Sequence, residues 1–166
     1  KQACLNANVP LLIDPKGTDW NKYSGATLLS PNFKELKEAS GTSITNSDEE
    51  VAEVGGKMKA QFKVENLLVT RSSKGMTLIG DSVQHWKATA REVFDVSGAG
   101  DTVIATIGAA LASGVNLPEA IQLANEAAGQ VIAKSGTATL SADELSTAII
   151  LNSSQSVVFT NGCFDI

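Results

Sequence analysis

The segment Ser97-Gly98-Ala99-Gly100-Asp101 places small residues and one acid directly before an apolar helical run. The first turn of a helix leaves backbone N–H groups unpaired and carries about half a positive charge, so it attracts anions. Small residues at Gly98, Ala99 and Gly100 let an anion approach those N–H groups without meeting a Cβ atom. The pattern therefore predicts an anion site at the start of this helix.

Asp101 is the unexpected member of the pattern, because a carboxylate is repelled by a bound anion. The arrangement makes sense if the anion is a group in transfer: the N–H groups stabilise its developing charge while Asp101 takes a proton from the attacking hydroxyl. The alternative is that the helix dipole alone favours an acid here, by about 0.3–1 kcal/mol. These residues by themselves leave both interpretations open.

Two other nucleotide-binding patterns are excluded. A dinucleotide fingerprint requires Gly-x-Gly-x-x-Gly, and the third glycine position here holds Val103. The sequence also contains no Gly-x-x-x-x-Gly-Lys followed by Ser or Thr.

The composition is that of a soluble globular protein with one core: 166 residues, 43% hydrophobic and 19% charged. The formal charge of −5 argues against nucleic acid as a partner. No stretch reaches the length of a membrane span, so we expect no membrane association. The two cysteines, Cys4 and Cys163, match no metal spacing or disulfide framework, which fits a reducing cytoplasm.

Short apolar runs bounded by turn residues, and helix-capping patterns between them, predict an α/β chain. We expect strands at 9–13 (buried), 26–29, 66–70, 75–80 and 157–160, with 83–90 also extended. We expect helices from Asn32, from Ser47 to about Phe62, over Val103–Leu111 with Gly114 as its stop, from Pro118, and from Ser141. Ser47 with Glu50, and Ser141 with Glu144, have the spacing of capping boxes. The polar segment 152–156 is predicted to be a linker.

Three motifs in register resemble the ribokinase-like (PfkB) sugar kinases. Asp95–Thr102 resembles the C-terminal signature of that family, and Asn32-Phe33-Lys34-Glu35 matches its Asn-x-x-Glu motif. Val69–Met76 stands where the family has a strand followed by a nucleotide-contacting turn. The resemblance covers residue 1 to about residue 151. It implies a ribokinase-like three-layer α/β/α fold with a mainly parallel sheet, present here as a partial domain.

The resemblance implies a role for each matching residue. Asp101 would be the catalytic base, and the amides of Gly98, Ala99 and Gly100 would hold the γ-phosphoryl group. Asn32 and Glu35 would organise Mg²⁺ and the phosphates, largely through water. The alternative for this pair is structural, because Asn at an N-cap with Glu three residues later is itself a capping arrangement.

The resemblance also implies a set of ATP contacts. Gly75 would allow the tight turn, and Arg71 would face a phosphate unless it is simply an arginine on a solvated loop. Asn125 and the loop 135–138, with Gly136, would close around adenine and, in some members, around a monovalent cation such as K⁺. The full set of expected ATP contacts is Asn32, Phe33, Lys34, Glu35, Thr70, Arg71, Ser72, Gly75, Asn125 and Gly136.

A narrower resemblance is to the bacterial bifunctional heptose enzymes, carried by Asp14–Asp19 followed by Gly25–Asn32. Their first domain phosphorylates D-glycero-β-D-manno-heptose 7-phosphate at the 1-position with ATP. Their second domain makes ADP-heptose for the lipopolysaccharide core, and Val157–Ile166 resembles its opening strand. This implies a kinase part at 1–151, a linker at 152–156, a truncated second domain at 157–166, and a cytoplasmic homodimer. Lys16 would approach a phosphate, or is as readily a solvated turn lysine.

The abrupt ends suggest a piece of a longer protein, and in this family the sugar site comes mainly from the preceding half. We therefore expect little kinase activity from residues 1–166 alone. Two alternatives remain: a ribokinase-like enzyme for another sugar, such as ribose, a nucleoside or fructose phosphate, and a non-catalytic kinase-like module. His85 is interpreted as a surface or packing residue, and Cys163 as a small strand-end residue.

Overall fold

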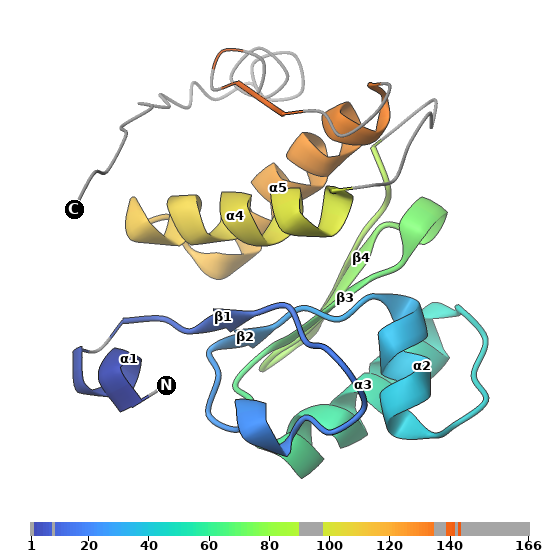
Figure 1. Ribbon diagram of the computed structural model, residues 1–166. Coiled ribbons are helices and arrows are strands. Elements are labelled where there is room, and N and C mark those ends of the chain that lie inside the picture. Colours follow the sequence, from blue (N-terminus) through green and yellow to red (C-terminus); the bar gives the residue numbers. More distant parts are fainter. Residues whose placement is uncertain (1, 8, 90–97, 135–138, 142, 144–166) are drawn as a thin grey trace. The chain divides into compact units, whose positions relative to one another are not determined.

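The computed structural model describes residues 2–7, 9–89, 98–134, 139–141 and 143 (Figure 1). The chain divides into two compact units, Lys1–Ala88 and Thr89–Ile166. The first unit holds the sheet together with helices α1 (Gln2–Ala7), α2 (Phe33–Ser40) and α3 (Asp48–Phe62). The second unit holds helices α4 (Ala99–Ala112) and α5 (Leu117–Ile132).

The sheet of the first unit has five strands in the spatial order β1-β2-β3-β4-β5. They are β1 (Leu12–Ile13), β2 (Leu28–Leu29), β3 (Leu67–Thr70), β4 (Met76–Ile79) and β5 (Val83–Trp86). The pairs β1–β2 and β2–β3 are parallel, whereas β3–β4 and β4–β5 are antiparallel. All strands except β4 therefore run in the same direction. The carboxyl ends of β1, β2 and β3 thus lie at the same edge of the sheet.

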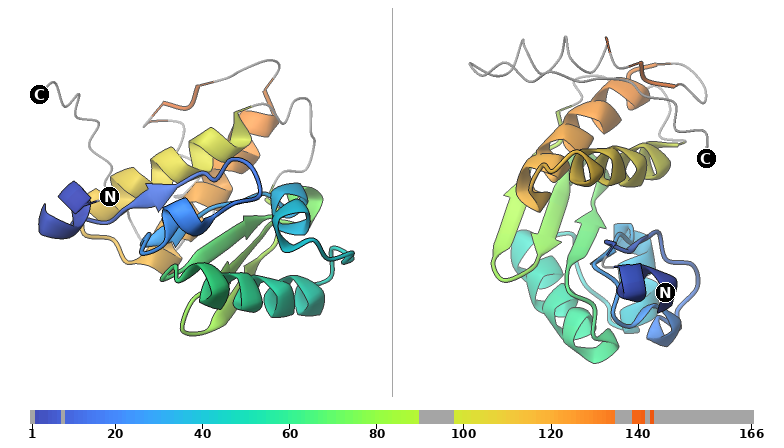
Figure 2. Two further views of the ribbon diagram at one scale, coloured as in Figure 1. Left: turned by 60° about the horizontal axis from the view of Figure 1, so that its bottom comes forward. Right: turned by 90° about the vertical axis from the view of Figure 1, so that its left-hand side faces the viewer.

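Helices α2 and α3 pack against one face of this sheet (Figure 2). Alternate strand residues supply the sheet side of this core, because successive side chains of a strand point to opposite faces. The buried cluster consists of Trp20, Ala26, Leu29, Leu36, Val51, Val54, Met58, Phe62, Val64, Leu67, Val69 and Ile79. The opposite face is also apolar and buried at Leu28, Leu68 and Leu78. Strands that are apolar on both faces are typical of a sheet covered on both sides.

The strands predicted within the first unit are present, but the first two are shorter than expected, and the first is also less buried. β1 begins only at Leu12, because Pro10 has no N–H to donate and the N–H of Leu11 donates to the Thr27 hydroxyl at 3.0 Å instead. Val9 is exposed, so the expectation of a buried strand from that residue is wrong.

Helix α3 starts where the sequence predicts, but its capping box is only half formed. The Ser47 hydroxyl accepts from the N–H of Glu50 at 3.2 Å. The Glu50 carboxylate does not return to Ser47; it accepts hydrogen bonds from the N–H and the hydroxyl of Thr45. The cause is a nearer pair of donors in the preceding loop, which the spacing Ser-x-x-Glu does not reveal.

In the second unit, α4 and α5 pack along each other, with Val103, Ile107 and Ala110 buried on the predicted face of α4. Gly114, in the left-handed region at φ +85°, follows the end of α4 and confirms the predicted stop. Asn116 caps α5 by accepting from the N–H of Glu119 at 3.0 Å. The predicted capping box at Ser141, the linker 152–156 and the strand 157–160 lie wholly or partly outside the described residues.

Candidate active site

Three loop segments meet at the edge of the sheet where the parallel strands end. Asp14 follows β1, Asn32 follows β2 and Arg71 follows β3. The N–H of Thr70 donates to the carbonyl of Pro31 at 3.0 Å, and Asn32 pairs with Thr70 in an isolated parallel bridge. The Asn-x-x-Glu motif and the turn after β3 are therefore direct neighbours. Ligands of open α/β sheets bind at this carboxyl edge.

Asn32 and Glu35 form a complete capping box at the start of α2. The Asn32 side chain accepts from the N–H of Glu35 at 2.9 Å, and Glu35 Oε2 accepts from the N–H of Asn32 at 2.8 Å. The structural interpretation of this pair is therefore correct. It leaves Glu35 Oε1 outside the box, so a role at a metal ion stays a prediction for that oxygen.

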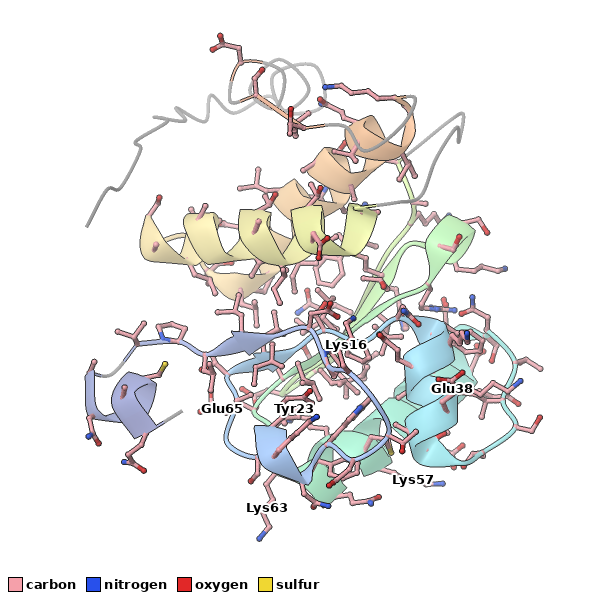
Figure 3. The ribbon with its side chains drawn as sticks, in the orientation of Figure 1. Lys16, Tyr23, Glu38, Lys57, Lys63 and Glu65 are labelled. Carbon is pink, nitrogen blue, oxygen red and sulfur yellow. The ribbon has the colours of Figure 1, made fainter. Side chains whose placement is uncertain are left out.

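Lys16, labelled in Figure 3, contacts the carboxylates of Asp14 and Glu35. Its ammonium donates to Asp14 Oδ2 at 2.7 Å and to Glu35 Oε1 at 3.2 Å. Two carboxylate oxygens thus already share one cation, and oxygen is the ligand that Mg²⁺ prefers. The donor set therefore fits Mg²⁺. Among the described residues there is no group of three or more His, Cys, Asp and Glu that could hold a metal, so an ion here would keep most of its waters.

Arg71 is only 1% exposed, and its guanidinium is used inside the protein. Nε and Nη2 donate to the side-chain and backbone oxygens of Asn46, both at 2.8 Å, while Nη1 donates to Asp48 at 2.5 Å and to the Thr77 hydroxyl at 2.8 Å. The interpretation as an arginine on a solvated loop is wrong. A contact between Arg71 and an ATP phosphate stays a prediction.

The partners of Arg71 were missed by sequence reasoning. Asn46 and Asp48 precede it by more than twenty positions, in the loop before α3 and in its first turn, and no local pattern links them to β3. His85 Nδ1 lies 2.9 Å from the Thr77 hydroxyl, so this histidine is a partly exposed member of the same network. Its interpretation as a surface or packing residue agrees with that position.

The turn after β3 is tight, as the glycine predicts. Ser72 has φ +55°, a left-handed conformation that is uncommon for a residue with a side chain. Gly75 has φ +83°, and a Cβ atom there would lie 1.9 Å from the carbonyl oxygen of Trp86 and 2.6 Å from the nitrogen of Ala88. Glycine at position 75 is thus required by the close passage of the chain after β5. Ser72 and Lys74 lie on the exposed side of the turn.

The start of α4 carries the small residues and the candidate base. Gly98 is its N-cap at φ +81° and offers no side-chain cap; Ala99 and Gly100 are its first two residues and the exposed Asp101 its third. The helix thus begins before Asp101, earlier than expected. A Cβ atom at Gly98 or Gly100 meets nothing within 4 Å among the described residues, so an anion has room to reach these amides.

The other expected ATP contacts have varied surroundings. Phe33 is half-buried against the core, and the exposed Lys34 pairs with Glu38 at 3.8 Å. Asn125 is buried in α5, where its backbone carbonyl accepts from the Thr89 hydroxyl at 3.1 Å. Gly136 and its loop lie outside the described residues. The structure thus joins Asn32–Glu35 with Thr70–Gly75 in the first unit, while Gly98–Asp101 and Asn125 belong to the second.

The charged clusters around Lys16 and Arg71 each contain a group with a shifted pKa. The hydrogen bond to Asp14, reinforced by Glu35, raises the pKa of Lys16, which keeps its ammonium charged. The hydrogen bond from Arg71 holds the pKa of Asp48 below its ordinary value. Both shifts favour the ionised partners, so the two clusters are ion pairs at neutral pH.

The fold and these motifs agree with known proteins. The profile of the pfkB family carbohydrate kinases matches residues 1–144. The chain belongs to this family. Among solved structures, ribokinase from Arabidopsis thaliana, complexed with ribose and ATP, shares 27% identity at a TM-score of 0.73, over 82% of this chain and 45% of that one. Phosphofructokinase-2 from Escherichia coli reaches a TM-score of 0.78 at 18% identity, over 90% and 50%. The fold is therefore ribokinase-like α/β, as predicted.

The relatives of this chain include proteins called bifunctional protein HldE. The chain is 46% identical to the one from Aeromonas hydrophila, over 99% of this chain and 39% of that protein. It is 44% identical to the one from Haemophilus influenzae, with the same coverage. The chain thus spans about two fifths of the length of these relatives. None of the helices that the structure describes is both long and apolar enough to cross a membrane.

Proposed function

We propose that this chain forms the nucleotide and base side of a kinase that phosphorylates D-glycero-β-D-manno-heptose 7-phosphate at the 1-position with ATP. Membership of the pfkB family supports the reaction class, and the 44–46% identity to HldE proteins supports the narrower substrate. Two segments resemble the heptose enzymes, Asp14–Asp19 and Gly25–Asn32. The first begins directly after β1 and the second ends after β2, so Asp14 and Asn32 both stand at the carboxyl edge of the sheet.

The observation that carries the proposed chemistry is the open start of α4. Asp101 accepts the proton of the sugar 1-hydroxyl as that oxygen attacks the γ-phosphorus of ATP, and the bond from this phosphorus to the β-phosphate oxygen breaks to release ADP. The amides of Gly98, Ala99 and Gly100 stabilise the charge on the transferring group. These roles are supported by the exposure of Asp101 and by the lack of any described atom within 4 Å of a Cβ at Gly98 or Gly100.

Metal ions complete the proposal. Asn32 and Glu35 would hold Mg²⁺, chiefly through water, and the bound ion would neutralise charge on the phosphates. The oxygen donors around Lys16 support this placement. We also propose K⁺ near Asn125 and the 135–138 loop; a structure of the similar Escherichia coli phosphofructokinase-2 is in complex with potassium.

The full-length protein would be a cytoplasmic homodimer with a second, adenylyltransferase activity that makes ADP-heptose. Residues 1–151 would be kinase, 152–156 linker and 157–166 the first strand of the second domain. The chain covers 39% of the relatives' length, which supports a longer bifunctional protein as the working unit. Residues 1–166 alone would then turn over little or no heptose 7-phosphate, and measurable turnover by them would contradict this division.

The test is a coupled ADP-release assay on the full-length protein with three acceptors: heptose 7-phosphate, ribose and fructose 6-phosphate. The expected result is turnover selective for the heptose. Preference for either other sugar would keep the kinase and discard the heptose assignment. No ADP release with any of them, from a protein that is folded, would favour a non-catalytic kinase-like module.

A further inference from the structure

The loop that carries Lys16 is fixed by two aromatic residues. Trp20 is fully buried, and its indole N–H donates to the carbonyl of Gly17 at 2.9 Å. The Tyr23 hydroxyl accepts from the N–H of Lys16 at 3.1 Å and donates to the carbonyl of Lys16 at 3.4 Å. The backbone of Lys16 is thus held on both sides, although its side chain is 69% exposed. A surface lysine in an unconstrained turn has no such anchoring.

The ammonium of Lys16 is placed on one particular oxygen of Glu35. Oε2 of that carboxylate is used by the capping box with Asn32, whereas Oε1 accepts from Lys16. Glu35 is also the less exposed partner, at 18%, and Asp14 contributes the second carboxylate. The oxygen left over for a metal ion, or for its water, is therefore the one that the lysine holds.

We propose that Lys16 competes with Mg²⁺ for the carboxylates of Asp14 and Glu35. Without metal, the ammonium holds the two carboxylates together; when Mg²⁺ arrives, the ammonium gives up Glu35 Oε1. This inference rests on the proposed magnesium role of Glu35. Lys16 is accordingly a positioning residue that sets how much Mg²⁺ the site requires.

The sign of the effect follows from charge. With Lys16 present, Asp14, Lys16 and Glu35 together carry one net negative charge; without it, two carboxylates face each other with no counter-ion. A divalent cation is attracted more strongly to the second arrangement. Removal of the lysine should therefore tighten divalent-metal binding, by roughly two- to tenfold, the range expected for one or two partly exposed ion pairs.

The experiment measures Mn²⁺ binding to the full-length protein from the electron paramagnetic resonance of free Mn²⁺, without ATP and without turnover. Lys16→Met is compared with wild type. Lys57→Met is the matched control, because Lys57 is 70% exposed and pairs with Glu53 at 2.6 Å within one helix, away from the sheet edge (Figure 3). Glu35→Gln tests the metal role itself, and thermal unfolding confirms that each variant is folded.

Tighter Mn²⁺ binding in Lys16→Met, unchanged binding in Lys57→Met and weaker binding in Glu35→Gln support the proposal. If Glu35→Gln weakens binding but Lys16→Met leaves it unchanged or weakens it, the competition is wrong and the magnesium role survives. If Glu35→Gln has no effect on Mn²⁺ binding, or wild type binds no Mn²⁺ without ATP, Lys16 has no metal ion to compete with at Glu35 and the inference falls.

Discussion

Two helix starts of this protein, those of α2 and α4, carry the signature residues of the same kinase family and are built in opposite ways. At α2, Asn32 and Glu35 satisfy each other's backbone N–H groups, and the free carboxylate oxygen is taken by Lys16. At α4, the cap is Gly98, which offers no side-chain cap among the described residues, and Asp101 stands exposed in the first turn.

We interpret the start of α2 as a place that binds and positions groups, and the start of α4 as the place where the reaction occurs. Helices α3 and α5 are capped by Ser47 and Asn116 in the ordinary way, so an uncapped start is a departure within this chain. The first N–H groups of a helix have no partner within the helix, so a start without a side-chain cap leaves them available to a ligand. We therefore expect changes at α4 to affect mainly catalytic rate, and changes at α2 to affect stability and metal or nucleotide binding.

The largest expected effect is that of Asp101→Asn. The amide cannot accept the proton of the sugar hydroxyl, so kcat should fall by about 10²-fold or more. Glu119→Gln is the matched control, because Glu119 is likewise the third residue of its helix, α5, but follows a capped start. Both changes remove the same favourable interaction with a helix dipole. Steady-state ADP release and thermal unfolding are measured on both.

Equal losses of activity in the Asp101 and Glu119 variants would show that Asp101 is only a helix-dipole residue. A loss confined to Asp101→Asn, with similar unfolding temperatures in the two variants, would support its role as the base.

The next prediction separates an effect on kcat from an effect on the stability of α4. Gly100→Ala adds a methyl group that meets no described atom, so the helix should be stabilised, by up to about 0.5–1 kcal/mol. The same methyl group crowds the proposed anion site, so kcat should fall by about tenfold. Gly108→Ala is the control, because Gly108 is also in α4 and a Cβ atom there also meets no described atom within 4 Å. This variant should stabilise the helix without lowering kcat. A fully active Gly100→Ala protein would argue against an anion site at these amides.

A smaller effect is expected at the capped start of α2. Asn32→Ala should lower the free energy of unfolding by about 1 kcal/mol, because the N–H of Glu35 loses its acceptor. Asn116→Ala, at the equivalent position of α5, should cost a similar amount. Only Asn32→Ala should also raise the KM for ATP. If the two variants have the same KM, Asn32 is a cap and nothing more.

Most of the fold could be predicted from sequence because its signals are local. The apolar runs identified every strand of the first unit, and the caps at Ser47 and Asn32 lie at helix starts. Prediction failed where a competing partner comes from another segment. The Thr27 hydroxyl takes the N–H of Leu11 and shortens β1.

The candidate site was predictable as a set of motifs but not as contacts. Nothing in Val69–Met76 indicates that the guanidinium of Arg71 is buried, since Asn46 and Asp48 reach it from a distant loop. Lys16 gave an ambiguous signal for a similar reason. The role proposed for Lys16 depends on its hydrogen bond to Glu35, nineteen positions later, and on the buried Trp20, which fixes the loop.

The smallest expected effect concerns a third acid at a helix start, Asp48, the first residue of α3. Asp48 has a basic partner, because Arg71 donates to its carboxylate and lowers its pKa from the ordinary value of 3.8. A carboxyl group whose pKa is lower in the folded state stabilises the fold fully above its unfolded pKa. That contribution is lost as the pH falls through the lower, folded value.

Asp48→Asn should therefore destabilise the protein modestly at pH 7, and the difference from wild type should shrink as the pH falls below 3.8. Denaturant unfolding at several pH values measures it, and Glu49→Gln, the next residue in the same first turn, is the control for the helix dipole. A pH-independent difference would mean that the ion pair with Arg71 contributes nothing. A loss of kcat in Asp48→Asn at neutral pH, without loss of folded protein, would contradict the distinction between the structural Asp48 and the catalytic Asp101. An acid that is ion-paired with Arg71 would then also serve the reaction.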